Sequence, residues 1–453
     1  MRPRGVLPVV SAAVFLANLD LFVVNVALPV MNEDYDTTLA ALSWVLNAYA
    51  IVFAALLVVA GRLADRYGHR QVFLLGLAVF TAASAACALA PGVGTLVAAR
   101  AVQAAGAAML MPTSLALLLA ATPAEGRPRA IRLWASVGGI AAGLGPVAGG
   151  LLVEADWRWV FLINLPFGLA AFAAGLRALP ALPRAEAGPF PDLAGAALLT
   201  LGIGALAVGL VRAEEGGWTG PETLGGLAAG AAATAAFLWR SARHPAPVVE
   251  LPLLRVRAFA AANTGALLFT VAFAGMLLTA VLWCQDVWGY SALATGLAVA
   301  PGPLIVPPVT LATGALTRRL GAAPVLWLGS AAFGAGLLWW LATAGERPSY
   351  AAELLPGMLL TGLGVGLALP TLIGASAASL PPERFATGSA ITTMNRQIGA
   401  VLGVALAVSI LGTPATAEAA VDGFRGVWLL GLAAMALLAA AAVPLRVRPS
   451  PAG

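Results

Sequence analysis

Lysine is absent from this chain, because all 25 basic residues are arginines. The phosphate-binding loop of an ATPase and the Schiff base of a pyridoxal enzyme both need a lysine amine, so both chemistries are excluded. Cysteine and histidine are nearly absent as well. Cys87, Cys284, His69 and His244 are far apart in the sequence and lack the spacing of metal ligands. We therefore expect no metal site and no cofactor.

Charge is also scarce. Charged residues make up 10% of the chain and hydrophobic residues 60%, and the mean hydropathy is +0.92. An ordinary soluble domain has about 25% charged residues. This composition indicates a protein that lies almost entirely within a membrane.

Long apolar segments follow one another along the whole chain. A window of about 19 residues predicts fourteen spans. They cover residues 6–31, 40–60, 71–90, 92–118, 130–152, 157–177, 193–211, 223–240, 258–283, 291–316, 322–343, 351–379, 385–412 and 425–445. An even number of spans places both termini on one side, and the first segment is too long for a signal-peptide core.

The arginines fix the orientation. If the N-terminus is cytoplasmic, nearly all loop arginines fall inside, and only Arg158, Arg212, Arg347 and Arg425 fall outside. Positive charge is enriched in cytoplasmic loops, so we predict that both termini are cytoplasmic. This topology explains the excess of arginine, and no nucleic-acid partner is expected.

The two halves of the chain resemble each other. The segment 61–68 recurs at 314–321, and Gly106 and Pro112 recur as Gly364 and Pro370. Similar shifts on the same side of the membrane indicate a parallel duplication of a six-span bundle. We predict an N-terminal bundle over 1–178, two extra helices with linkers over 179–257, and a C-terminal bundle over 258–453.

Five motifs carry a family resemblance. They are the loop residues Gly61, Asp65, Arg66, Gly68 and Arg70, the run 19–29, Arg100 with Gln103, the glycine-rich set Gly139, Gly143, Gly145, Pro146, Gly149 and Gly150, and the run 156–168. In this order they resemble the major facilitator superfamily, specifically its fourteen-span drug:proton antiporter branch. Three positions depart from the family pattern, namely His69 for arginine, Ala104 for glycine and Phe22 for threonine.

The resemblance implies an all-α polytopic membrane protein with two six-helix bundles plus two linker helices. It implies proton-driven efflux of hydrophobic drugs or antibiotics by alternating access, powered by the proton gradient. The expected partners are protons, a hydrophobic small molecule and the lipid bilayer of the inner membrane, and we expect a monomer that is not an enzyme. The alternative is an importer or symporter of a small metabolite, which the glycine-rich motif disfavours.

Asp20 is the one acid deep inside a predicted span. A carboxylate at this depth costs about 2.5–3.5 kcal/mol on the insertion scale, so it should face the bundle interior. Counting residues from the outer helix ends places Arg100 at the same depth. We predict that the two residues couple proton movement to transport. The alternative is an ion pair that never titrates.

The loop after the second predicted span has two interpretations. Its charges, Asp65, Arg66 and Arg70, are solvated cytoplasmic charges in the simpler one. The family resemblance instead implies a latch, in which Asp65 faces the N-terminal end of a helix near Phe385. A carboxylate gains about 0.3–1 kcal/mol at such a position, which is enough to bias a two-state equilibrium.

The fifth predicted span is rich in glycine. Gly139, Gly143 and Gly150, together with Pro146, are expected on one bare face that lets a neighbouring helix approach closely. The alternative is general small-residue packing, since glycine is common throughout the chain.

Aromatic and amide side chains are the candidates for substrate contact. They are Phe22, Asn25, Trp44, Asn47, Tyr49, Gln103, Gln285, Asn395 and Arg396. A structural or gating role is the alternative for Asn395 and Arg396. Trp283 and Trp288 are expected in the aromatic belt at the membrane interface.

Overall fold

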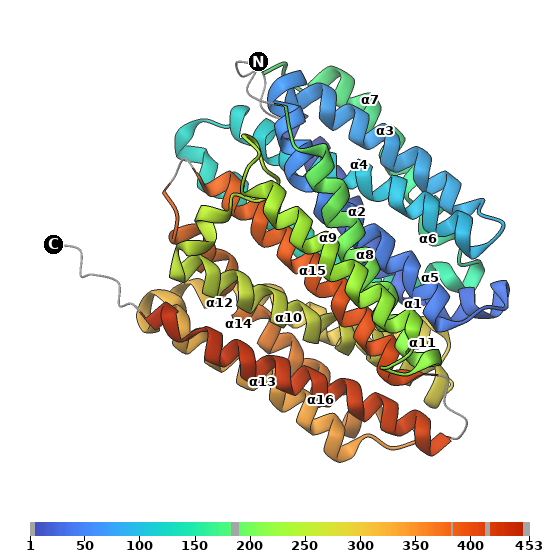
Figure 1. The fold of residues 1–453 in the computed structure, drawn as a ribbon. Helices are drawn as coiled ribbons and strands as arrows, with labels where there is room; N and C mark the ends of the chain where they lie inside the picture. Colours follow the sequence, from blue (N-terminus) through green and yellow to red (C-terminus); the bar gives the residue numbers. More distant parts are fainter. Residues whose placement is uncertain (1–4, 183–189, 382–383, 413–416, 447–453) are drawn as a thin grey trace. The chain divides into compact units, whose positions relative to one another are not determined.

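A computed structural model describes residues 5–182, 190–381, 384–412 and 417–446, and all of their regular structure is helical (Figure 1). The helices are α1 (Val6–Tyr35), α2 (Leu39–Tyr67), α3 (His69–Ala88), α4 (Val93–Ala120), α5 (Arg127–Ala155), α6 (Trp159–Leu162), α7 (Asn164–Ala178), α8 (Leu193–Gly216), α9 (Pro221–Ser241), α10 (Arg257–Leu282), α11 (Ala292–Val299), α12 (Pro301–Leu320), α13 (Ala322–Thr343), α14 (Leu355–Ala378), α15 (Phe385–Leu411) and α16 (Ala417–Ala441). The predicted all-α membrane fold is confirmed.

Thirteen helical stretches among the described residues are long and apolar enough to cross a membrane. Some combine two labelled elements, such as α6 with α7 and α11 with α12. The fourteenth predicted span corresponds to α9, which is long enough at 21 residues. It is not among the thirteen stretches, and alanine and glycine take the place of large aliphatic side chains over much of its length.

The chain forms two compact units. The first comprises residues 1–204, 230–248 and 291–296, and the second comprises 205–229, 249–290 and 297–453. In the first unit, α1 packs on α5 and α4 packs on both α2 and α3 (Figure 1). In the second unit, α10 packs on α15 and α16, and α14 packs on α12 and α13. The expected linker pair, α8 and α9, is divided between the two units.

The internal duplication appears as the same helix contact in each unit. A Cβ atom on Gly106 of α4 would lie 2.6 Å from the Phe80 nitrogen of α3, and one on Gly364 of α14 would lie 2.7 Å from the Phe333 nitrogen of α13. Glycine is needed at these two positions because the backbones approach too closely for any side chain. The sequence repeat is therefore also a repeat of helix packing.

A second feature of the repeat is the turn after the second helix of each bundle. Gly68 joins α2 to α3 with φ +105°, and Gly321 joins α12 to α13 with φ +88°. Glycine adopts positive φ angles without steric cost. Both turns can therefore be tight, which explains why glycine recurs at this position of the repeat.

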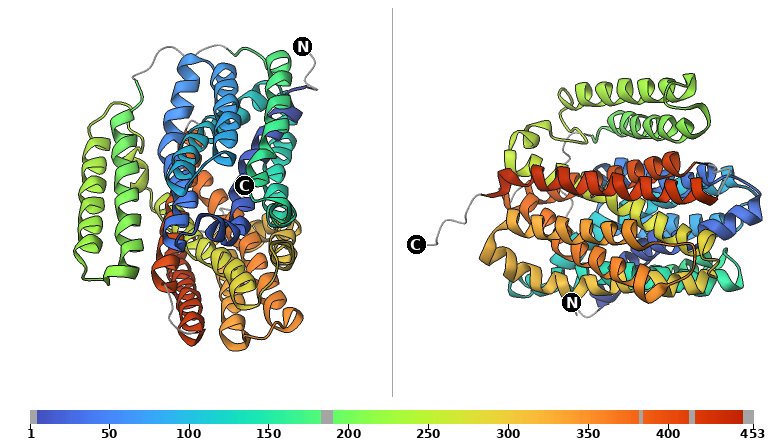
Figure 2. Two further views of the ribbon diagram at one scale, coloured as in Figure 1. Left: turned by 90° about the vertical axis from the view of Figure 1, so that its right-hand side faces the viewer. Right: turned by 90° about the horizontal axis from the view of Figure 1, so that it is seen from below.

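Helices α8 and α9 lie side by side as a hairpin (Figure 2). A Cβ atom on Gly226 of α9 would lie 2.6 Å from the Cα atom of Gly209 on α8, so the two backbones touch there. At the open end of the hairpin, the buried carboxylate of Asp192 accepts a hydrogen bond from Arg240 Nε at 2.6 Å. Close backbone packing at Gly209 and Gly226 and the ion pair between Asp192 and Arg240 therefore both hold α8 against α9.

Candidate functional site

A buried ion pair lies in the middle of the first unit. Asp20, the fifteenth residue of α1, accepts a charge-assisted hydrogen bond from Arg100 of α4 through Oδ2. Asp20 is 1% exposed and Arg100 is fully buried. Charges removed from water in this way need partners for their remaining donors and lone pairs, and neutral neighbours supply them.

The carboxylate of Asp20 has two further donors. Gln103 Nε2 lies 2.9 Å from Asp20 Oδ1, and Asn164 Nδ2 of α7 lies 3.1 Å from the same oxygen. Both amides also reach Ser84 Oγ on α3, at 2.8 Å and 3.3 Å. Four helices therefore meet at one carboxylate, and all the side chains involved are buried.

The guanidinium group of Arg100 is held on three other sides. Its Nε donates to the Val45 carbonyl of α2 at 3.1 Å, and its Nη1 donates to Gln103 Oε1 at 2.6 Å. Its Cζ lies 4.3 Å from the ring centre of Tyr49, a cation–π distance. Its Nη2 is buried without an acceptor among the described residues. The cation is compensated mainly by Asp20.

Three members of this network were not predicted as site residues. Asn164 lies within a run that was noted only for its family resemblance, while Ser84 and the Val45 carbonyl gave no signal. Gln103 and Tyr49 were expected to contact substrate, but the structure places both against Arg100. An amide in an otherwise apolar run is the signal that points to Asn164.

The expected latch residues lie at the end of α2 and the start of α3 rather than in a loop, because the two helices are separated only by Gly68. Gly61 lies on α2 next to Pro112 of α4, and Gly68 forms the turn. The Asp65 carboxylate is exposed and lies 3.3 Å from His69 Nε2, one helical turn further along the chain. Within its own unit, Asp65 therefore already has a partner that becomes a cation when His69 is protonated.

Arg66, in the last turn of α2, and Arg70, in the first turn of α3, have separate contacts. The Arg66 guanidinium lies 5.7 Å from the ring centre of Phe190. Arg70 Nη2 donates to the Leu176 carbonyl at 2.5 Å, in the last turn of α7. A cation at the C-terminal end of a helix is favourable, so Arg70 also ties α3 to α7.

The glycine-rich motif of α5 presents two close contacts rather than one bare face. Cβ atoms on Gly145 and Gly149 would lie 2.4 Å from Phe22 Cβ and 2.8 Å from the Val23 carbonyl, both on α1. A Cβ atom on Gly150 would lie 2.5 Å from the Ala292 carbonyl, at the start of α11.

The other motif residues of α5 differ in whether they contact a neighbouring helix. Pro146 lies one turn before Gly150 and also contacts the α11 segment, since its carbonyl would lie 2.2 Å from a Cβ atom on Gly296. No described atom lies within 4 Å of the Cβ position of Gly139, and Gly143 is buried. The close contacts of α5 among the described residues therefore lie in its C-terminal half.

The other candidates in the first unit have mixed surroundings. Phe22 and Trp44 are partly exposed. The Asn25 amide donates to the Leu21 carbonyl of its own helix at 2.9 Å. Asn47 is 1% exposed, and both polar atoms of its amide lack a partner among the described residues.

The candidates in the second unit lie on two helices. Asn395 Nδ2 of α15 donates to Asn263 Oδ1 of α10 at 3.1 Å. Arg396 is partly exposed, and its Nε is buried without an acceptor among the described residues. Gln285, just beyond the end of α10, is also partly exposed.

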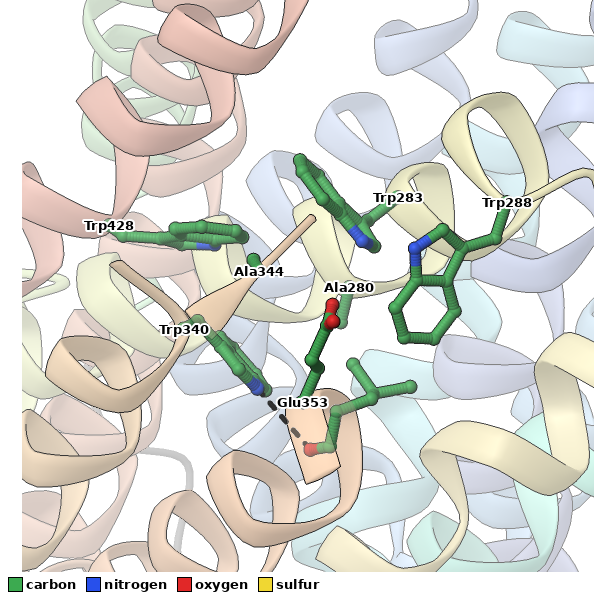
Figure 3. A pocket seen from close by; sticks show the side chains of 8 residues that line it. Ala280, Trp283, Trp288, Trp340, Ala344, Glu353 and Trp428 are labelled. Atoms are coloured by element: carbon green, nitrogen blue, oxygen red, sulfur yellow. Dashed lines mark hydrogen bonds between the residues drawn. The ribbon is translucent and has the colours of Figure 1, made fainter. Parts of the chain in front are cut away.

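A tryptophan-rich pocket lies in the second unit (Figure 3). Its cavity volume is only about 10 Å³. The lining residues are Ala280, Trp283, Trp288, Trp340, Ala344, Glu353, Leu354 and Trp428. Ligand pockets for drug-sized molecules begin at about 300 Å³, so this pocket is too small to be the transport site.

Trp283 and Trp288, which were expected in the aromatic belt at the membrane interface, are both buried by protein in the second unit. They are 2% and 7% exposed. Trp283 packs on Trp428 with ring centres 5.4 Å apart, and Trp288 Nε1 donates to the Gly345 carbonyl at 2.9 Å. Helix packing in the second unit covers both rings, which a local sequence pattern does not reveal.

The comparisons with known proteins agree with this architecture. The model of the Major Facilitator Superfamily matches residues 10–404. The chain is 36% identical over 401 residues to "Multidrug resistance protein Stp" of Mycobacterium tuberculosis, covering 88% of this chain and 74% of that protein. It is 34% identical over 413 residues to "Tetracenomycin C resistance and export protein" of Streptomyces glaucescens, covering 89% and 75%.

A solved structure shows the same fold. The crystal structure of "peptide transporter POT in complex with sulfate" superimposes with a TM-score of 0.71 at 17% identity, covering 99% of this chain and 96% of that chain. At this level of identity the likeness establishes the fold alone.

Proposed function

Because the chain belongs to the Major Facilitator Superfamily, we propose that it exports hydrophobic drugs or antibiotics in exchange for protons. The relatives named for multidrug resistance and for tetracenomycin C resistance and export support drug export. The protein crosses the membrane many times, and we place it in the bacterial cytoplasmic membrane as a monomer with both termini in the cytoplasm.

The observation that carries proton coupling is the buried network around Asp20. Protonation of Asp20 removes the one charge that compensates Arg100, while the Val45 carbonyl and the Tyr49 ring supply only partial charge. An uncompensated buried charge costs about 3–5 kcal/mol. A conformation that gives Arg100 access to water is then favoured, so one proton shifts the equilibrium between two states.

Export follows if substrate and proton favour opposite states. The deprotonated, ion-paired form takes substrate from the cytoplasm, and protonation from the outside drives its release. The glycine contacts of α5 with α1 and with the start of α11 give this motion a tightly packed surface. Asp65, paired with His69, is assigned the role of a latch that biases the two states.

Transport of a fluorescent hydrophobic dye into inverted membrane vesicles tests the proposal. An acidic vesicle interior should drive dye uptake by the wild-type protein, and Asp20→Asn should abolish it at equal protein level. Glu33→Gln is the matched control, because Glu33 is an exposed acid on the same helix. Dye uptake by Asp20→Asn at the wild-type rate, driven by the same proton gradient, would refute the coupling role of Asp20.

A further inference from the structure

Arg100 and Arg396 both lie well away from the ends of their apolar spans, and their surroundings differ. Arg100 has an ion pair, two further hydrogen bonds and an aromatic ring. Arg396 is the tenth residue of the 25-residue span Thr387–Leu411. At about 1.5 Å per residue it lies about 13 Å from the start of that span. Arg396 is therefore not one of the cytoplasmic loop charges that set orientation.

Arg396 has no counter-charge in the part of the chain that the structure describes. No described carboxylate forms an ion pair with it, and no described group accepts a hydrogen bond from it. In the same unit, Glu250 pairs with Arg384 and Asp422 pairs with Arg425. These acids lie in a loop and near a helix end.

The neutral groups near Arg396 in sequence satisfy one another. Asn395 donates to Asn263, Asn263 Nδ2 lies 3.4 Å from Ser376 Oγ, and Ser376 and Thr392 are 2.7 Å apart. This chain of hydrogen bonds joins α10, α14 and α15 without using Arg396.

Two hydrogen-bond donors next to Asn395 in the sequence take no part in this series of hydrogen bonds. Arg396 Nε and Gln397 Nε2 are both buried without an acceptor among the described residues. A buried donor without an acceptor is costly, and it commonly marks the place of a missing partner. The rest of the Arg396 side chain is partly exposed, so a ligand can reach it.

An unpaired cation within a membrane span is expensive, and a guanidinium group matches a carboxylate with two parallel hydrogen bonds. We infer that Arg396 binds the acidic group of the transported molecule, so the substrates of this protein are hydrophobic organic anions, carboxylates above all. This inference rests on the export function proposed above, and it adds a substrate class that the relatives' names do not state.

The test compares a charged and an uncharged probe of the same shape. Anthracenecarboxylate and its carboxamide are titrated by fluorescence against the full chain in nanodiscs. The wild-type protein should bind the carboxylate about tenfold more tightly than the amide, the size expected for one charge-assisted contact. Arg396→Gln should bind the two probes equally, with amide affinity changed less than about threefold.

Two further variants control for charge and folding. Arg396→Lys keeps the cation and should retain part of the preference. Arg425→Gln removes an exposed arginine that is paired with Asp422, and it should keep the full preference. Unchanged affinity of the amide shows that Arg396→Gln is folded.

The inference is overturned if the wild-type protein binds both probes equally or binds neither. It is also overturned if Arg396→Gln retains the preference for the carboxylate. Because binding needs no proton gradient, a carboxylate preference without gradient-driven transport would reject only the export proposal. Gradient-driven export of neutral dyes without such a preference would reject only this inference.

Discussion

At the residue scale, the structure places Asp20 against Arg100, whereas Arg396 has no carboxylate partner among the described residues. Asp20 receives hydrogen bonds from Arg100, Gln103 and Asn164. These donors supply the partners that a charge buried in an apolar bundle needs.

The shape of the Arg100 side chain should matter as much as its charge. In Arg100→Lys, a single ammonium group cannot donate to Asp20, Gln103 and the Val45 carbonyl with the fork geometry of a guanidinium. We expect at least about a tenfold loss of dye efflux, measured in cells and normalised to the protein in the membrane.

Arg158→Lys is the control for this substitution. Arg158 is 37% exposed and pairs with Asp34 at 3.2 Å, and exposed pairs contribute about 0–1 kcal/mol. Efflux should stay within about twofold of wild type. Equal efflux by Arg100→Lys and wild type would show that the fork geometry is not required.

At the scale of elements, two glycines of α5 lie where the backbones of other helices approach it closely. Gly149 faces a carbonyl of α1, and Gly150 faces the first turn of α11. Glycine in a helix interior costs about 0.5–1 kcal/mol relative to alanine. Close helix approach is therefore the physical reason for glycine at these two positions, whereas Gly139 has no such neighbour.

Two alanine substitutions on α5 should differ in their effect on the stability of the folded protein. Gly149→Ala places a Cβ atom 2.8 Å from the Val23 carbonyl, and such overpacking typically costs about 1–3 kcal/mol. Gly139→Ala meets nothing within 4 Å and should be neutral or slightly stabilising. Thermal unfolding of the purified protein measures both, and a lower midpoint for Gly139→Ala than for Gly149→Ala would contradict the assignment.

At the scale of the whole molecule, the predicted orientation can be tested with cysteine labelling. The two native cysteines, Cys87 and Cys284, are buried, so they should give little background. Arg347, in the loop after α13, and Arg319, in the last turn of α12, are exposed and are predicted to lie outside and inside, respectively.

A membrane-impermeant maleimide should label Arg347→Cys in intact cells and Arg319→Cys only after permeabilisation. The outcome depends on the arginine distribution that sets topology. The reverse labelling pattern would invert the proposed orientation and, with it, the direction of drug movement.

Features that depend on local composition could be predicted from the amino-acid sequence alone. Hydropathy fixed the apolar spans, the recurrence of Gly106 as Gly364 revealed the duplication, and the depth of Asp20 and Arg100 singled out both residues. These signals are readable because a membrane imposes the same length and polarity on every span.

Which polar groups contact one another became clear only from the packing of the helices. Asn164 and Ser84 join Asp20 because α1, α3, α4 and α7 converge there, and Trp283 is buried because α16 covers it. The pairing of Arg100 and the lack of an ion-pair partner for Arg396 among the described residues follow from packing in the same way. Which faces of packed helices meet depends on contacts between residues far apart in the chain, and no local pattern encodes those contacts.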